Sequence, residues 1–369
     1  MKCEVEFLPV GDASKAGDAI VVRYGEPDAY ELMLVDGGTL DTGDAIVTHL
    51  RKEFGASTTL SHIVLTHSDA DHASGLRTVL AQVPTANLWL HIPWLHAEET
   101  LPLFRDKRWT AAGLAKAIKD EYAIISEIVD LALEKGCAIH FPAQGARIGP
   151  FTVLAPNRAT YNYLLPQFDR TPEPDQAAIE AAQMWIGKPN AFAKLMELAL
   201  KAAEKWTSET WDNERLRDGG VTAASNESSV ILYADLGPSN RLLLTGDAGV
   251  NALWWAVNFA RANGLPLQQF SFVQVPHHGS RRNVGPTVLD ALLGPKEPAS
   301  TNRFAAFVSA PKDDSSHPRK IVLNAFMRRG GKVIITQGAK KVHWGGFPAR
   351  PGYVTAEAAT FSSTVEDYD

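Results

Sequence analysis

The sequence predicts an α/β fold in which two packed β-sheets are covered by helices. Strand-length segments rich in Val, Ile, Leu and aromatic residues recur in two separate groups, one toward each end of the 369-residue chain. Amphipathic helical patterns lie between and after these groups. Strands in two groups with helices between and after them suggest two layers of sheet, each with its outer face covered by helices.

The predicted elements follow in chain order. Five strands are expected in the first group, at 3–10, 18–25, 30–38, 62–67 and 87–93, and five in the second, at 229–235, 241–247, 270–277, 303–310 and 332–338. Helices are expected at 75–83, 111–136, 189–206 and 321–331. We expect one domain over residues 1–369, with a helical insertion at 157–221 bounded by loops, and a frayed acidic end at "TVEDYD".

Composition restricts the class of protein. The chain is 45% hydrophobic and 21% charged, which is typical of a globular protein able to bury a large core. No run of eighteen apolar residues occurs, and the first residues carry acids and a Pro, so we expect neither a membrane span nor secretion but a cytoplasmic protein. Cys3 and Cys137 are too few for a disulfide framework and are expected to be buried thiols.

Charge is unevenly distributed along the chain. The net charge is -6, yet residues 276–345 contain twelve Lys or Arg and four acids. The rest of the chain therefore totals -14, which argues against a protein that coats nucleic acid over its whole surface. The basic stretch therefore predicts a local, positively charged surface.

The sequence "IVLTHSDADHASGL" places two histidines and two aspartates within six positions behind an apolar strand. Ionised carboxylates so close together repel one another, so the cluster needs abundant water or a cation. Single polar residues at strand ends are usually turn or cap residues. Here they recur at strand ends that are expected to converge on one rim of a sheet, which favours a metal site. The cluster and the recurring residues are His67, Asp69, Asp71, His72, Asp36, Asp247, His277, His278 and His317.

These motifs carry a family resemblance. "HSDADH", "NESSVIL", "LLTGD", "VPHHGS" and "SSHP", with the opening "GDASKAGDAIVVRYG" and "MLVDGG", resemble the metallo-β-lactamase superfamily, and within it the soluble hydrolase domain of the ComEC/Rec2 DNA-uptake proteins. The resemblance spans nearly the whole chain apart from the helical insertions, and the membrane channel of ComEC is absent from it. It implies a four-layer αββα sandwich with its site at the sheet rim.

The resemblance also implies a ligand set for two divalent metal ions. His67 and Asp69 would hold one metal, Asp71 and His72 the second, and Asp247 would bridge them. Either His277 or His278 would complete the second site. Many family members have a further His before the bridging Asp, and His91, His96 and His140 give no convincing match to it.

The expected chemistry follows from these ligands. Asp69 replaces the usual His of this motif, and an oxygen-rich site makes Mn²⁺ a candidate beside Zn²⁺. A metal pair would activate hydroxide as the nucleophile. Asp71 is expected to orient it, His317 to donate a proton to the leaving group or contact a phosphate, and Asp36 to orient a ligand His.

Basic residues bear on the substrate. Arg281 and Arg282, with Ser280 before them, directly follow the His pair, and Arg319 and Lys320 follow His317, as expected for contacts to a phosphodiester. Other cations have a plainer interpretation as solvated edge residues. Several aromatic residues favour core packing over base stacking. The remaining cations are Arg328, Arg329, Lys340 and Lys341, and the aromatics are Trp206, Trp211, Trp254 and Trp255.

The leading hypothesis is a metal-dependent phosphodiesterase, a nuclease with DNA as its substrate. One alternative is a hydrolase of a small ester, lactone, cyclic nucleotide or lactam, because this fold hosts many reactions. Another is a non-catalytic binding or effector module, against which the intact cluster of acids argues. The helical insertion is a candidate lid or protein-partner surface.

Overall fold

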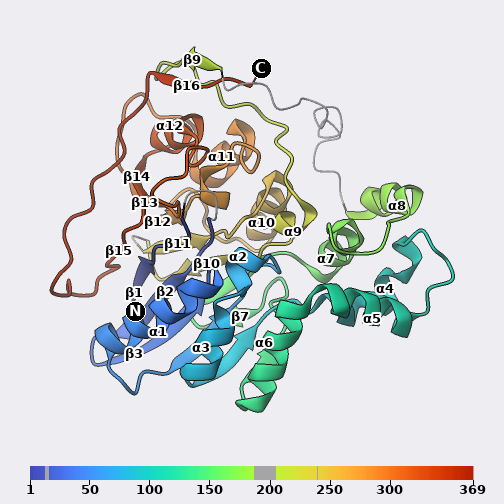
Figure 1. The fold of residues 1–369 in the computed structure, drawn as a ribbon. Coiled ribbons are helices and arrows are strands. Elements are labelled where there is room, and N and C mark those ends of the chain that lie inside the picture. Colours follow the sequence, from blue (N-terminus) through green and yellow to red (C-terminus); the bar gives the residue numbers. More distant parts are fainter. Residues whose placement is uncertain (13–15, 187–204, 239, 369) are drawn as a thin grey trace.

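The computed structural model of the chain describes residues 1–12, 16–186, 205–238 and 240–368. Within these ranges the chain forms two seven-stranded β-sheets and one two-stranded sheet, with helices on the outer faces of the large sheets (Figure 1). The two large sheets lie one against the other, so the architecture is a four-layer sandwich of helices, sheet, sheet and helices. The predicted α/β fold class is confirmed.

The first large sheet is built mainly from the N-terminal part of the chain. Its strand order is β15-β1-β2-β3-β4-β5-β6. Strands β1 to β3 and β15 pair antiparallel, and β3 to β6 pair parallel. The bounds are β1 Lys2–Phe7, β2 Ile20–Glu26, β3 Ala29–Val35, β4 Leu60–Val64, β5 Thr85–Trp89, β6 Ala138–His140 and β15 Lys341–His343.

The second large sheet has the order β14-β13-β12-β11-β10-β8-β7. Its strands β11 to β14 are parallel, so their carboxyl ends lie at one edge. The bounds are β7 Arg147–Ile148, β8 Phe151–Ala155, β10 Ile231–Asp235, β11 Arg241–Leu244, β12 Phe272–Gln274, β13 Phe304–Val308 and β14 Gly331–Ile335. The small sheet pairs β9 Trp206–Ser208 with β16 Thr364–Glu366.

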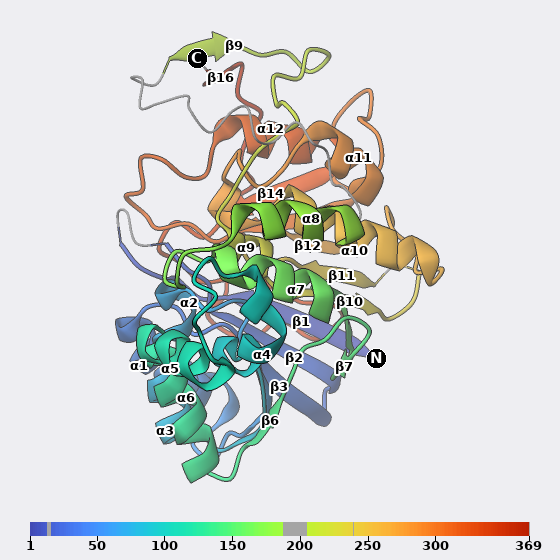
Figure 2. The ribbon, with the colours of Figure 1, turned by 90° about the vertical axis from the view of Figure 1, so that its right-hand side faces the viewer.

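Helices cover both sheets (Figure 2). Those on the first sheet include α1 Leu40–Phe54, α3 Leu76–Gln82, α5 Ala111–Glu121 and α6 Ala123–Glu134, and those on the second include α10 Val250–Ala262, α11 Pro286–Leu293 and α12 Lys320–Arg328. The others are α2 Ala70–Ala73, α4 Ala97–Thr100, α7 Arg158–Leu164, α8 Gln176–Ile186 and α9 Ala224–Glu227. No helix within the described ranges is both long and apolar enough to cross a membrane.

Alternating burial along the strands builds two cores. In β2, Ile20 and Val22 belong to the cluster between the two sheets, while Val21 belongs to the cluster under the helices. Successive side chains of a strand point to opposite faces, so a strand covered on both sides reads as a continuous apolar run. The apolar runs of the sequence are therefore strands that are buried on both faces.

All ten predicted strands have a counterpart, and the predicted helix at 111–136 is divided at Tyr122 into α5 and α6. Strands β6, β7, β9, β15 and β16 were not predicted because each has only two or three residues, too few to show a period. Strand β8 has five residues and was also not predicted. Between 157 and 221 the described residues form α7, α8 and β9, and most of the predicted helix at 189–206 lies outside the described residues. The expected frayed end is wrong, because "TVE" forms β16, in which Val365 and Glu366 are buried.

Two arginines at the end of α12 correct a second expectation. Arg328 and Arg329 are 0% exposed rather than solvated. Arg328 pairs with Glu209 at 3.3 Å, and Arg329 pairs with Glu214 and Asp290 at 2.8 Å each. These pairs fasten the segment after β9 to α12 and α11. The two arginines are therefore structural and do not contact substrate.

Replacing Arg328 with Ala is expected to lower the free energy of unfolding by about 3–5 kcal/mol, because the change leaves the Glu209 carboxylate buried without its partner. Urea unfolding measures the change. Lys332→Ala, at a half-buried position on the adjacent strand β14, is the control and should change stability by about 0.5 kcal/mol or less. Equal effects of the two substitutions would contradict the assigned role.

Candidate metal centre

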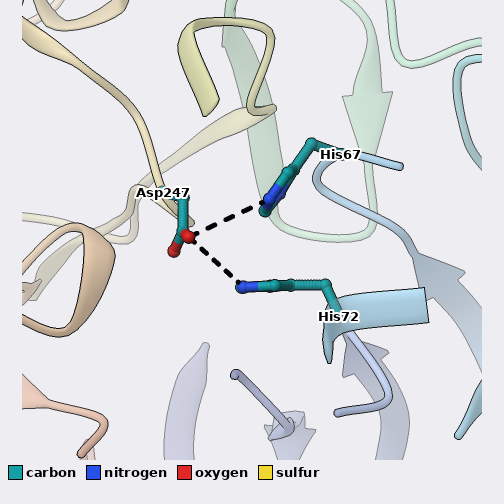
Figure 3. A group of neighbouring side chains, drawn as sticks. All are labelled: His67, His72 and Asp247. Carbon is teal, nitrogen blue, oxygen red and sulfur yellow. Dashed lines mark ion pairs between the residues drawn. The ribbon is translucent and has the colours of Figure 1, made fainter. Parts of the chain in front are cut away.

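The candidate site lies where strands of both sheets end. His67 follows β4, and Asp71 and His72 lie on the short helix α2. Asp247 follows β11 in the other sheet. Figure 3 shows the rings of His67 and His72 converging on the carboxylate of Asp247. The sheet edges thus bring together residues that are 175 or more positions apart in the sequence.

Asp247 is the centre of the cluster. Its Oδ2 lies 3.9 Å from Nε2 of His67, 3.4 Å from Nε2 of His72 and 3.7 Å from Nε2 of His277. Its Oδ1 lies 3.8 Å from Nε2 of His278. The side chain of Asp247 is only 4% exposed. One carboxylate therefore faces four imidazoles with its two oxygens, as a bridging ligand would.

The remaining acids divide the site into two halves. Asp69 lies 3.5 Å from Nε2 of His67, and its Oδ2 accepts a hydrogen bond from Ser225 at 3.1 Å. Asp71, His72 and His278 each offer a ligand atom, and these atoms lie within 4.8 Å of one another. The structure therefore groups His278 with Asp71 and His72, whereas the sequence did not distinguish between His277 and His278 for this position.

The first two histidines are held in one tautomer by Asp36. The carboxylate of Asp36 accepts from Nδ1 of His72 at 2.8 Å and from the Thr66 hydroxyl at 2.7 Å. Because the Thr66 hydroxyl donates to Asp36, it accepts from Nδ1 of His67 at 3.0 Å. Both Nδ1 atoms therefore carry a proton, so Nε2 is the atom at which either ring would release its second proton and bind a metal.

The second pair of histidines is also contacted at Nδ1. Nδ1 of His278 donates to the carbonyl of Ser309 at 3.0 Å. Nδ1 of His277 lies 3.0 Å from Oδ1 of Asn283 and 2.9 Å from the amide nitrogen of Asn226, so this ring has both an acceptor and a donor beside the same atom. The contacts at Nδ1 thus direct Nε2 of His67, His72 and His278 to the metal position, whereas they fit either tautomer of His277.

The donor atoms fit a cation. Nε2 of His67, His72 and His278 and Oδ1 of Asp247 are buried and have no hydrogen-bond partner among the described residues. Such atoms are costly to bury unpaired, and they fall into two overlapping groups, His67 with His72 and Asp247, and His72 with His278 and Asp71, each of which calls for a shared partner. Asp36, His277 and His278 also have positive φ angles of 59°, 46° and 53°, a strained conformation that often marks functional positions. A divalent metal is the partner that this donor set fits.

Electrostatics agree with the geometry. Burial opposes charge on His72, yet Asp247 and Asp36 hold the pKa of this imidazole well above its usual range. Burial likewise opposes the charge on Asp247, and His277, His72 and His278 hold the pKa of this carboxyl well below its usual range. Burial lowers the pKa of His278 to about 3; Asp247 opposes this shift, and the neighbouring imidazoles of His277 and His72 add to it. The site therefore favours positive charge at its centre.

Several residues of the site were not predicted. Asp18 is 1% exposed and accepts a hydrogen bond from the amide of Gln274 at 2.7 Å, and burial raises the pKa of its carboxyl to about 7. Gly17 passes so close to Asp71 that an added Cβ would lie 2.1 Å from its carbonyl oxygen. The "GDA" and "NESS" motifs were visible as part of the resemblance, but their contacts span the two sheets. The unpredicted residues are Asp18, Gln274, Ser225, Asn226 and Asn283.

The three other candidate histidines lie apart from the cluster. In the described part of the chain, none of His91, His96 and His140 belongs to a group of side chains that could together hold a metal ion. His91 is half-buried with its ring 4.1 Å from that of Tyr161 between centroids; both of its ring nitrogens are buried, and this burial lowers the pKa of His91 to about 3. His140 bonds Asn87 on the neighbouring strand.

His91 gives a pH prediction. Its pKa is about 3 in the fold against an ordinary value of 6.5, so below pH 6.5 the unfolded chain binds more protons and stability falls as pH falls. Between pH 6.5 and 4.5 this group should cost about 2–3 kcal/mol. Urea unfolding with chelator present should show that His91→Phe loses about 2–3 kcal/mol less free energy of unfolding than the unaltered chain between pH 6.5 and 4.5. His140→Gln is the control, and an unchanged pH slope in His91→Phe would contradict the prediction.

The predicted substrate-side residues lie near the same loops. The ring of His317 lies parallel to that of His277, 6.2 Å away, and its Nδ1 is 3.3 Å from Asp314. Ser280 is buried, and its hydroxyl accepts from the backbone of Arg282, which is exposed. Arg281 is half-buried, and its guanidinium contacts the Tyr368 ring and the backbone carbonyl of Asp367 near the end of the described chain.

Residues 15–137 match the family model described as Metallo-beta-lactamase superfamily. This stretch contains Asp36 and the motif from His67 to His72. The chain thus has a metallo-β-lactamase type of fold, with sequence similarity to that superfamily over its first third. No curated protein matched the chain in sequence.

Solved structures include remote likenesses. The metallo-beta-lactamase fold protein YhfI from Bacillus subtilis is 10% identical with a TM-score of 0.40, over 93% of this chain and all of that chain. A beta-lactamase domain protein from Burkholderia ambifaria is 12% identical with a TM-score of 0.33, over 77% of this chain and 70% of that one. A Cronobacter sakazakii metallo-beta-lactamase is 11% identical with a TM-score of 0.32, over 73% and 76%. At such scores the fold assignment rests on the sheets of this chain and on the family match.

Proposed function

We propose that the protein is a metal-dependent hydrolase of phosphodiesters, with DNA as its substrate. The observation that carries the proposal is the convergence of four Nε2 atoms on the buried carboxylate of Asp247, with Asp69 and Asp71 beside it. Three carboxylates and four imidazoles form a donor set suited to two divalent cations, either Mn²⁺ or Zn²⁺.

The ligands divide between two positions. His67, Asp69 and Asp247 would hold one cation, and Asp71, His72 and His278 the other, with Asp247 shared. Two divalent cations bound there would lower the pKa of a water and neutralise the oxygens of the substrate. Nε2 of His277 faces Asp247 from the half-exposed side of the site and is available to either half.

The chain itself provides proton transfer and orientation. Asp71 is half-buried on α2, where its carboxylate can accept a hydrogen bond from the attacking water. Asp314 lies 3.3 Å from Nδ1 of His317 and stabilises the charged form of this half-buried ring, whose Nε2–H would give its proton to the leaving oxygen. Burial lowers the pKa of His317, which makes that proton easier to release. Asp71 would thus act on the attacking oxygen and His317 on the leaving oxygen.

The basic loops favour a phosphodiester over an uncharged substrate. Arg281 and Arg282 lie three and four residues after His278, and Arg319 follows His317 within two residues. Guanidinium groups bind phosphate oxygens through charge-assisted hydrogen bonds, which an ester, lactone or lactam does not need. Arg328 and Arg329 are buried, but Arg282 and Lys320 are exposed and follow the two His-containing loops, and exposed cations of this kind suit a nucleic-acid backbone.

Cleavage assays test the proposal. Protein treated with chelator is given Mn²⁺ or Zn²⁺ together with single-stranded, double-stranded or circular DNA, or bis-p-nitrophenyl phosphate. We expect cleavage of DNA that requires metal and is reduced at least about 10²-fold in Asp71→Ala. His317→Gln should mainly lower kcat, because it removes the proton donor and not a ligand.

Two outcomes would contradict the proposal. Cleavage of the small diester without cleavage of any DNA would reject DNA as substrate. Hydrolysis of a lactone or lactam in preference to every diester, with the same dependence on Asp71, would reject phosphodiesters altogether.

A further inference from the structure

Two arginines near the candidate site hold one aromatic ring of the chain itself. The guanidinium carbon of Arg217 lies 4.8 Å from the ring centroid of Tyr368, and that of Arg281 lies 4.6 Å from it. The backbone N–H of Arg217 donates to the Tyr368 hydroxyl at 3.0 Å. Arg281 also donates to the backbone carbonyl of Asp367. We name Arg217 and Arg281 together the arginine clamp.

The clamp lies on two segments that lead into the candidate metal centre. Arg281 is three residues after His278, so their Cα atoms are at most about 11 Å apart. Arg217 belongs to the segment that ends at Ser225, whose hydroxyl touches Asp69. An added Cβ on Gly220 would lie 2.4 Å from the carbonyl oxygen of Arg282, so the two segments run in contact.

The segment that carries Tyr368 is anchored independently of the clamp. Strand β16 pairs with β9, and Val365 is fully buried. The carboxylate of Glu366 accepts from the backbone N–H groups of Lys320 and Ile321 at the start of α12. Asp367 and Tyr368, by contrast, are only half-buried. The pairing of β16 with β9 (Figure 1) and the contacts of Glu366 thus do not depend on the contact between the Tyr368 ring and the clamp.

We propose that the arginine clamp is a nucleotide-binding subsite, in which Tyr368 occupies the place of a nucleobase and the Asp367 carbonyl the place of a phosphate oxygen. A guanidinium binds the face of any aromatic ring, and stacking of this kind is largely independent of base identity. Arg281 would exchange a neutral carbonyl for an anionic phosphate, which makes the stronger hydrogen bond. The inference rests on the proposed function and names a single-stranded nucleic acid as the substrate that reaches the site.

Binding measurements test the exchange. The probe is a fluorescent, phosphorothioate-linked (dT)10 oligomer on metal-loaded protein, recovered intact after each titration, and an abasic oligomer of the same length is its control. Tyr368→Ala removes the ring from the clamp and leaves the Asp367 carbonyl in place, so it should bind (dT)10 about fivefold tighter or more, with no matching gain for the abasic chain. Thermal unfolding of the variant checks that β16 is retained.

A second variant keeps the test decisive if Tyr368→Ala fails to fold. Arg217 is exposed, and Arg217→Gln removes one guanidinium without opening the core. This variant should bind (dT)10 about fivefold more weakly than the unaltered chain and bind the abasic oligomer nearly equally. Folded Tyr368→Ala with no tighter binding, or Arg217→Gln with unchanged (dT)10 affinity, would overturn the proposal.

The two proposals fail separately. Base-dependent binding that changes as expected in these variants, in a protein that cleaves no diester with any metal, would overturn the nuclease function and leave the clamp standing. Metal-dependent DNA cleavage with binding that ignores the presence of bases would overturn the clamp alone.

Discussion

Replacing Asp247 with Asn is expected to remove at least one of two bound metal ions and to lower the rate of diester hydrolysis by about 10³-fold or more. Loss of a residue that only hydrogen-bonds a metal ligand already lowers metal affinity or activity by about 10–100-fold, and Asp247 would be a ligand itself. The amide keeps the size of the side chain but has one acceptor oxygen and no charge. Both oxygens of Asp247 face imidazole Nε2 atoms from the two halves of the site. The substitution therefore removes the one ligand that the halves share.

Elemental analysis after dialysis, together with the hydrolysis rate, measures this effect. Asp28→Asn, in the exposed turn between β2 and β3, removes the same charge far from the site and should retain full metal content and rate. An Asp247→Asn protein that keeps two equivalents of metal and its activity would show that the cluster is not the metal site.

The second large effect is expected from Asp36, which touches no substrate. Its carboxylate accepts from Nδ1 of His72 and, through the Thr66 hydroxyl, controls His67. In Asp36→Asn the amide N–H₂ competes to face Nδ1 of His72, which would move the ring proton to Nε2 and block its lone pair. Metal affinity should fall about 10–100-fold.

Titration with Co²⁺ measures this change, because its visible absorption reports the number and type of ligands. A purely structural role of Asp36 would lower the midpoint of thermal unfolding without changing the spectrum of the bound metal. Thr39→Ala, which removes a hydroxyl at the N-terminus of α1 close by in the sequence, is the control. Unchanged affinity and spectrum in Asp36→Asn would contradict its role as a positioning residue.

The main architecture could be predicted from the sequence because strands that are buried on both faces appear as continuous apolar runs. Runs such as "MLVDGG" and "LLTGD" combine a continuous apolar stretch with an acid directly after it. Asp36 and Asp247 follow strands of the two different sheets and approach the same ring from opposite sides, Asp36 at Nδ1 of His72 and Asp247 at its Nε2. The family resemblance implied that Asp247 lies between His67 and His72, and both rings face its carboxylate.

The remaining features depend on contacts that no local pattern shows. Asn283 is an ordinary loop residue in the sequence, and its role appears only when the chain brings it to Nδ1 of His277. Arg328 and Arg329 read as surface charges because their acidic partners lie more than a hundred residues away, or on α11. The acidic residues before Tyr368 indicated a frayed end, but part of this segment is ordered as strand β16, which pairs with β9.

Anomalous diffraction from crystals grown with Mn²⁺ would test the central claim most directly. The account predicts two anomalous peaks on either side of Asp247, one within bonding distance of Nε2 of His67 and the other of Nε2 of His72 and His278. Absence of both peaks at saturating Mn²⁺ and Zn²⁺, or metal held elsewhere on the chain, would contradict the assignment of this cluster as the metal centre.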